Sequence, residues 1–297
     1  MRFDIAYVTT FDYTGEVAES QNELRAAPTS DERQNVVHYD VRTSPSARVF
    51  SYTDYWGTRV DTFGVRLPHQ HLRVIAQATV ETAPPRAMAV TPRLSDVTRA
   101  FRDEHQEFLT PTRHTAWGDD IAAAVEARRT DTGDDLVGFV LSLHRMVGTS
   151  IDYTPGATFV GVDVDTVWDK REGVCQDFAH LLVACCRAAG IPARYVSGYL
   201  FTTDDSTGQD VDGDEAVVQT HAWAEVAVPG FGWWGLDPTN RQEVGERHVK
   251  IGHGRDYDDV SPLRGVYGGG AEHGLQVTVD MRRTSLAEAQ QAQAQQQ

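Results

Sequence analysis

Three residues of this chain have types and spacing that suit nucleophilic catalysis. Cys175 stands at the first turn of a predicted helix, where free backbone amides and the helix dipole favour an anion. His221 begins a predicted strand, and Asp237 ends the next one. A thiolate nucleophile needs a base within hydrogen-bond reach, and the base needs an orienting partner. The sequence therefore predicts a catalytic triad of Cys175, His221 and Asp237.

A hairpin is expected to position the base and the acid. Its predicted strands span 221–228 and 232–237, joined by a short turn that begins at Pro229. Because one strand starts at His221 and the other ends at Asp237, both residues fall at the same end of the hairpin. Alternation places His221 on one face of its strand together with Trp223 and Glu225.

The predicted helix of the nucleophile spans residues 175–189. Apolar residues follow one side of it, which indicates a buried helix whose first turn faces a cleft. Gly173 lets the backbone approach closely before the helix, and Gly190 followed by Pro192 marks its end.

Each of the three residues also has a purely structural explanation. A free cysteine is most often a small core residue, and a histidine at a strand edge is more often structural than catalytic. Asp237 could simply cap a turn. These explanations weaken together, because one chain supplies the cysteine at a helix start and the other two residues at matched hairpin ends.

The order of predicted elements indicates an α+β fold. Short alternating segments up to residue 84 predict an N-terminal antiparallel β-domain, and Pro84 and Pro85 lie in a linker. The pattern turns helical from about 93 to 150, with a segment at 95–107 and two more that begin after Asp119-Asp120 and after Asp134-Asp135. These segments open a catalytic domain over 85–285. We expect loops at 154–174 and 241–274, a strand at 193–201 and a closing strand at 275–281. The Gln/Ala-rich tail at 286–297 is expected to be disordered.

The charge balance excludes some partners. The chain of 297 residues has 27 basic and 43 acidic residues, a formal charge of −16, which disfavours nucleic acid. Lys170 and Lys250 are its only lysines, and an acidic loop is expected at 202–213. Such a surface is typical of halophilic proteins, whose carboxylate repulsion is screened by concentrated salt. A GC-rich genome, which favours arginine codons, would produce the same bias.

The cysteines indicate a reduced protein. Cys175, Cys185 and Cys186 are odd in number, and two are adjacent, which does not suit a disulfide framework. Cys186 would lie about 16 Å along the helix from Cys175, so these thiols, even with His180, predict no metal site. We expect no cofactor. No window approaches the ~20 consecutive apolar residues of a membrane helix, so we predict a cytoplasmic protein without a membrane partner.

Four sequence blocks resemble the core of the bacterial and archaeal transglutaminase-like superfamily. They lie at 173–179, 190–199, 221–225 and 236–240, in the order of that family. Residues 1–84 resemble its N-terminal β-domain, and 254–265 resemble a downstream part of the subgroup. The resemblance implies a papain-like core of helices packed on an antiparallel sheet. It also implies that Cys175 is the nucleophile, His221 the base and Asp237 the orienting acid.

The triad leaves the acyl acceptor open. Attack on an amide carbonyl would give a thioester at Cys175, with nearby backbone amides, Trp168 or Gln176 as oxyanion donors. Water as the acceptor gives a protease or amidase acting on a peptide or protein substrate, which is the preferred interpretation. A lysine amine gives a protein-glutamine transamidase. A non-catalytic protein-binding module that uses the same cleft is the third hypothesis.

Overall fold

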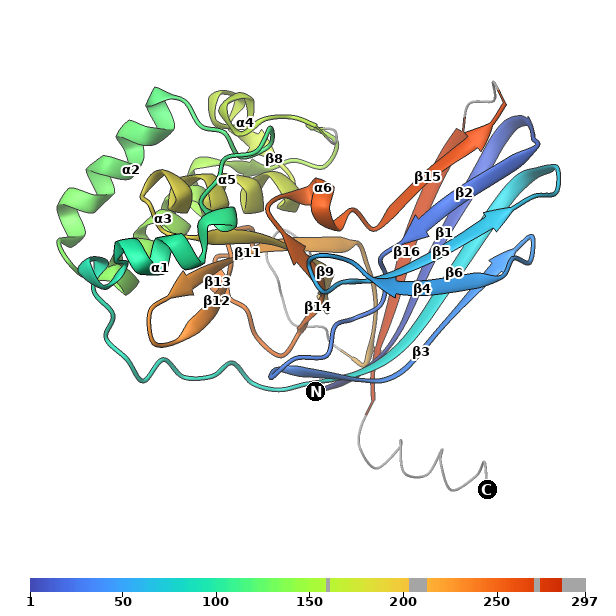
Figure 1. Cartoon of the computed structure of the whole chain (residues 1–297), viewed down its shortest axis with the longest axis horizontal. Helices are drawn as coiled ribbons and strands as arrows, with labels where there is room; N and C mark the ends of the chain where they lie inside the picture. The colour runs from blue at the N-terminus through green and yellow to red at the C-terminus, as the bar shows by residue number, and fades with distance from the viewer. Residues whose placement is uncertain (159–160, 203–212, 270–272, 285–297) are drawn as a thin grey trace.

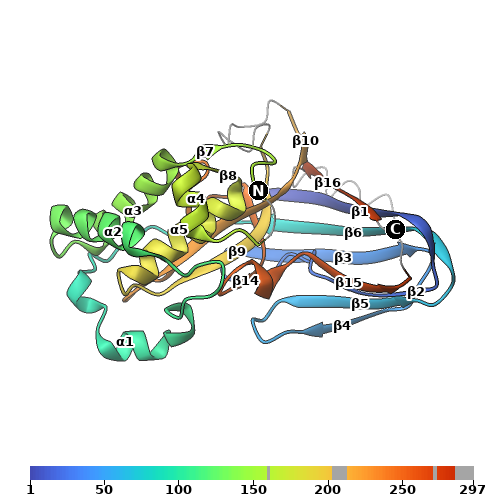
Figure 2. The same ribbon diagram turned by 90° about the horizontal axis from the view of Figure 1, so that it is seen from above.

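The computed structural model describes residues 1–158, 161–202, 213–269 and 273–284. Figure 1 shows two parts side by side: one of long antiparallel strands, the other of helices covering a second, shorter sheet. Figure 2 shows from above how the long strands extend away from the helical part. The predicted α+β class is confirmed.

Six strands near the N-terminus build most of a two-sheet sandwich. They are β1 (Arg2–Val17), β2 (Glu19–Leu24), β3 (Gln34–Ser44), β4 (Val49–Thr53), β5 (Arg59–Val65) and β6 (His69–Thr82). Alternation along β1 buries Phe3, Ile5 and Tyr7, and the rings of Phe3 and Tyr7 lie next to those of Phe201 and Tyr199. Strand β2 escapes sequence prediction because its buried positions include the polar residues Ser20 and Asn22.

Three strands from the second half of the chain complete these sheets. Strands β10 (Glu215–Val218) and β16 (His273–Arg283) extend the sheet to give the order β10-β16-β1-β6-β3, and β15 (Leu263–Gly268) joins the other as β15-β2-β5-β4. The predicted closing strand is confirmed as β16. The division into an N-terminal β-domain (1–84) and a catalytic domain (85–285) stays a prediction. After residue 213 the chain returns to the N-terminal sheets.

Residues 241–274 are not the irregular loop that the sequence predicts. They contain β13 (Gln242–Glu243), β14 (His248–Gly254), α6 (Tyr257–Val260) and β15. Strand β14 pairs with β9 through a register shift between Lys250 and Gly252. The alternation of β14 is broken there, so the strand is specified by its long-range partner rather than by its own pattern.

The second part is an antiparallel sheet covered by helices. Its order is β13-β12-β11-β9-β14, and β9 (Ala193–Leu200), β11 (Thr220–Val228) and β12 (Gly232–Asp237) are the predicted strands. The helices are α1 (Arg99–Glu104), α2 (Asp119–Thr132), α3 (Leu136–Ser150), α4 (Val164–Lys170) and α5 (Cys175–Ala188).

Two sequence predictions for this part need correction. The helix expected at 95–107 is three short pieces, because 3-10 turns at Leu94–Asp96 and Gln106–Phe108 flank α1. The loop expected at 154–174 contains α4 and the short strand β8 (Glu172–Gly173), which pairs with β7 (Asp152–Tyr153).

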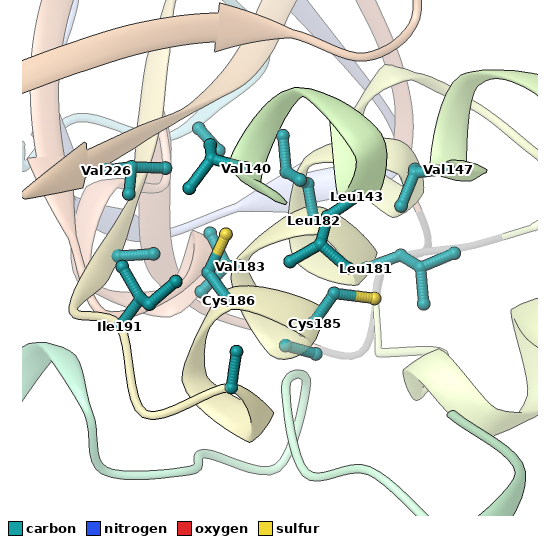
Figure 3. Close-up of a cluster of buried hydrophobic side chains, with 14 of the residues drawn as sticks. Val140, Leu143, Val147, Leu181, Leu182, Val183, Cys185, Cys186, Ile191 and Val226 are labelled. Atoms are coloured by element: carbon teal, nitrogen blue, oxygen red, sulfur yellow. The ribbon is translucent and has the colours of Figure 1, made fainter. Parts of the chain in front are cut away.

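Helix α5 lies at the centre of the hydrophobic core of this part. It packs against α3 and against strands β9 and β11. Figure 3 shows Cys185 and Cys186 among aliphatic side chains that include Val140, Leu143 and Val226. Burial raises the pKa of Cys186 to about 12 and that of Cys185 further, so both thiols stay protonated and unreactive.

Two predictions lie outside the described residues. They are the disorder of the tail at 286–297 and the structure of the acidic insert, of which 203–212 are not described. Within the described part of the chain, every helix is too short or too polar to cross a membrane.

Candidate active site

The first turn of α5 presents Cys175, which is half-buried. The preceding residue, Val174, is the N-cap, and its amide donates a hydrogen bond to Asp177 Oδ2 over 2.8 Å. Thr158 Oγ1 donates to the same oxygen over 2.5 Å. Gly173 is required by close packing, since a Cβ there would come within 2.9 Å of Asp177 Cβ. The helix start that carries the thiol is therefore fixed by its own cap.

His221 and Asp237 are buried partners at one end of the β11–β12 hairpin. His221 Nε2 donates a hydrogen bond to Asp237 Oδ2 over 2.8 Å. Burial alone would lower the pKa of His221, but the Asp237 carboxylate and Cys175 outweigh it and hold this pKa well above its usual value. Burial likewise opposes ionisation of Asp237, yet the charge of His221 and hydrogen bonds from His221 and His248 hold its pKa well below the usual range. The two side chains form an imidazolium–carboxylate pair.

Further side chains contact both the carboxylate and the backbone oxygen of Asp237 and hold the residue in place. His248 Nε2 donates to Oδ2 over 3.1 Å, and Asn240 Nδ2 does so over 2.7 Å. Burial lowers the pKa of His248, and its Nδ1 accepts the Gly245 amide over 3.1 Å, so the neutral ring carries its proton on Nε2. His144 Nε2 lies 2.9 Å from the backbone oxygen of Asp237.

Cys175 and His221 meet in a pocket of about 240 Å³ at the N-terminal end of α5, called here the Cys175 pocket. Both residues line this pocket, and Cys175 is one of the groups that raise the pKa of His221. Cys175 Sγ lies 3.9 Å from the Thr220 carbonyl oxygen. Because Asp237 binds Nε2 of His221, the Nδ1 atom is left for the thiol. The structure thus brings the three predicted residues into one line of contacts.

The rest of the Cys175 pocket has no acidic or basic side chain among the residues that the structure describes. Its lining consists of Tyr153, Val174, Gln176, Tyr195, Ser197, Gln219, Thr220, Ala222, Tyr257 and Pro262. Gln176, one of the predicted oxyanion donors, belongs to this lining. Trp168, the other, packs in the helical core with the Arg171 guanidinium 3.9 Å from its ring centroid. The pocket suits an uncharged group such as an amide.

Ligand atoms of His221, Asp237 and His248 lie within 4.8 Å of one another, a spacing that could hold a metal ion. Their mutual hydrogen bonds already account for this clustering. Cys185 and Cys186, weighed as ligands from the sequence, lie in the apolar core. The absence of a metal and of a cofactor stays a prediction.

Sequence reasoning missed His248 and Asn240 as partners of Asp237. For Asn240 a signal existed, since it lies three residues beyond Asp237 where an Asx-type turn is expected. For His248 there was none, because it stands on β14, in the segment that reads as a loop.

Known protein families match both parts of this chain. The sequence model of the transglutaminase-like superfamily matches residues 121–238, and that of the bacterial transglutaminase-like N-terminal region matches residues 3–81. An uncharacterized protein of Mycobacterium leprae is 36% identical over 289 residues, which cover 95% of this chain and 99% of that protein. The chain belongs to the transglutaminase-like superfamily.

Two further relatives have names that refer to an activity. The solved structure of a candidate cysteine protease from Cytophaga hutchinsonii has a TM-score of 0.72 at 22% identity, covering 96% of this chain and 92% of that one. It shows the same fold. A protein-glutamine gamma-glutamyltransferase of Pseudomonas aeruginosa is 36% identical over 111 residues, 35% of this chain and 16% of that protein.

Proposed function

We propose that this transglutaminase-like chain is a cysteine-dependent acyl-transfer enzyme that cleaves peptide or amide bonds through a thioester at Cys175. The observation that carries the proposal is the line of contacts from Cys175 through His221 to Asp237, opening into a pocket. A buried charged pair is expensive to desolvate. Here Nδ1 of His221, which Asp237 does not bind, is left for the half-buried thiol of Cys175 at the N-terminus of α5. Nucleophilic catalysis requires such a base beside the thiol.

The reaction would begin with the proton of Cys175 on His221, whose imidazolium form Asp237 stabilises. The thiolate attacks the carbonyl carbon of an amide, and His221 then gives its proton to the leaving amine. A thioester at Cys175 remains. An incoming nucleophile, deprotonated by His221, releases the acyl group and restores the thiol.

The identity of that nucleophile separates two candidate functions. Water would make the protein a protease or amidase of peptide or protein substrates, which we favour for a chain of this size without an identified cofactor. A lysine amine would make it a transamidase, supported by the likeness to the gamma-glutamyltransferase of Pseudomonas aeruginosa. The location in the cytoplasm stays a prediction.

Intact-protein mass spectrometry after incubation with glutamine-containing peptides, with and without a primary amine, tests the proposal. Wild type should carry an acyl adduct on Cys175 and convert peptide, whereas Cys175→Ala should do neither. Cys185→Ala is the matched control, because that thiol is buried in the core, and it should behave as wild type. Addition of water or of amine to the peptide distinguishes the two functions. Equal conversion by wild type and Cys175→Ala would rule out both, and a chain that captures peptide without converting it would be a binding module.

A further inference from the structure

Tyr195 carries a hydroxyl with no hydrogen-bond partner among the described residues. The residue is only 2% exposed, and its hydroxyl is not among the fully enclosed polar atoms that lack a partner, so this hydroxyl keeps access to solvent. Tyr195 lines the Cys175 pocket and interacts electrostatically with Cys175. A free donor therefore opens into the space that a substrate carbonyl must enter to reach the thiol.

The ring of Tyr195 has a fixed position. Strand β9 pairs it with Ala224 of β11 on one side and with Gly254 of β14 on the other. The His180 ring centroid lies 4.7 Å away, and Tyr257 packs edge-on at 6.4 Å. Burial keeps the pKa of His180 well below its usual value, so this neighbour is neutral. A donor held in this way needs no reorganisation when charge develops in front of it.

We propose that the Tyr195 hydroxyl is an oxyanion donor, an inference that rests on the acyl-transfer function proposed above. When Cys175 Sγ bonds to the carbonyl carbon, the π electrons of the C=O bond move to oxygen, and Tyr195 donates a hydrogen bond to that oxygen. Tyr195 keeps its proton throughout. The C=O bond re-forms as the C–N bond breaks, and the leaving amine takes its proton from His221.

Other donors reach the same space. The backbone amides of Cys175 and Gln176 make no hydrogen bond to another described residue and stand at the positive end of α5. Ser197 lies two residues beyond Tyr195 on the same face of β9 and also lines the pocket. Tyr195 is favoured over Ser197 because the rings of His180 and Tyr257 hold its side chain in one position. Burial raises the pKa of Tyr195 well above its usual value, which keeps the proton in place at any working pH.

Two reactions of the same thiol separate an oxyanion donor from a residue that activates Cys175. Acylation by p-nitrophenyl acetate passes through an oxyanion, whereas alkylation by iodoacetamide does not. In Tyr195→Phe the acylation rate should fall about 100-fold, while the alkylation rate stays within about twofold of wild type. Stopped-flow release of p-nitrophenolate and mass-spectrometric alkylation time courses give the two rates.

Tyr199→Phe is the matched control. It removes a buried phenol hydroxyl from the same strand, one that donates to the Ala26 carbonyl over 3.1 Å and does not line the Cys175 pocket. Both of its rates should equal those of wild type, and melting curves of both variants establish that they are folded.

Three results would overturn the assignment of Tyr195. They are an unchanged acylation rate in Tyr195→Phe, an equal loss in both reactions, or a 100-fold acylation loss that appears in Ser197→Ala instead. A wild-type protein that is alkylated but never acylated at Cys175 would overturn the proposed function itself, and the two failures are thereby distinguishable.

Discussion

His248 donates a 3.1 Å hydrogen bond to Asp237, beside the 2.8 Å bond that the same carboxylate oxygen accepts from His221. Both imidazoles are buried, but their protonation differs, because burial lowers the pKa of His248 while Asp237 and Cys175 raise that of His221. His248 is thus a neutral, fixed donor behind a charged pair. It positions Asp237 without touching the thiol.

Replacement of His248 tests this positioning role. His248→Phe keeps a ring but removes the donor, and kcat should fall about 10- to 100-fold because a hydrogen bond to a charged group contributes roughly 1.5–3 kcal/mol. His248→Gln retains an amide donor and should recover part of the loss. Steady-state kinetics with an unchanged KM would support positioning, whereas an unchanged kcat in His248→Phe would contradict it.

Stability should fall as the solution is acidified below the usual pKa of histidine. Burial lowers the pKa of four histidines among the described residues. For His253, the charges of Arg194 and Lys250 add to the effect of burial and lower the pKa to about 3. The others are His144, His180 and His248. The unfolded chain binds protons at these sites from about pH 6.5 downward and the folded chain does not, so each site lowers the unfolding free energy by up to about 1.4 kcal/mol per pH unit.

The sign of this effect can be checked at one residue. His253→Gln removes a titrating group, so its urea midpoint should vary less between pH 7 and pH 5 than that of wild type. His221 acts in the opposite direction, since its raised pKa contributes stability that is fully present below about pH 6.5 and is lost as the pH rises. A steeper pH dependence in His253→Gln would contradict the assignment.

Salt should stabilise the fold if the acidic surface is an adaptation to it. The formal charge is −16, and of the two lysines Lys250 is buried with its Nζ 2.7 Å from Glu225 Oε2, so it adds no exposed positive charge to the surface. Carboxylate repulsion at the surface weakens as the Debye length shortens. The melting temperature should therefore rise from low to molar potassium chloride. A melting temperature that does not rise would favour the explanation from codon usage.

The core around α5 should tolerate truncation poorly. Leu182 is fully buried among the side chains of Figure 3, and Leu182→Ala should cost roughly 2–5 kcal/mol of unfolding free energy through lost burial and the cavity left behind. Leu67→Ala is the matched control at a 65% exposed leucine and should change stability by no more than about 0.5 kcal/mol. Urea titrations of the two variants measure the difference, and equal costs would contradict the assigned core.

The parts of the site that the sequence could predict are those encoded locally. Gly173 before Cys175, and Gly190 with Pro192 after it, bound a helix that the structure has at Cys175–Ala188. The alternation of β11 and the short turn after it were enough to predict that His221 and Asp237 meet.

The parts that escaped prediction depend on contacts between distant segments. His248 reaches Asp237 because β14 pairs with β9, although β14 lacks a regular alternation of its own. Tyr195 reads as an ordinary strand residue, and its free hydroxyl beside Cys175 emerges only when α5 packs across β9. Strands β10 and β15 join the edges of the N-terminal sheets for the same reason, and the predicted closing strand β16 lies between β10 and β1, a pairing that its own sequence does not encode.

The central claim is that His221 activates Cys175 as a nucleophile, and the most direct test is the pH dependence of alkylation by iodoacetamide. Wild type should be labelled stoichiometrically at Cys175 near pH 6, where an ordinary thiol with a pKa of about 8.5 reacts slowly. His221→Ala should lose this reactivity at pH 6 and regain it only at alkaline pH, and Cys185 and Cys186 should stay unlabelled in the folded protein. Labelling of Cys175 that is slow at pH 6 and indifferent to His221→Ala would contradict the account.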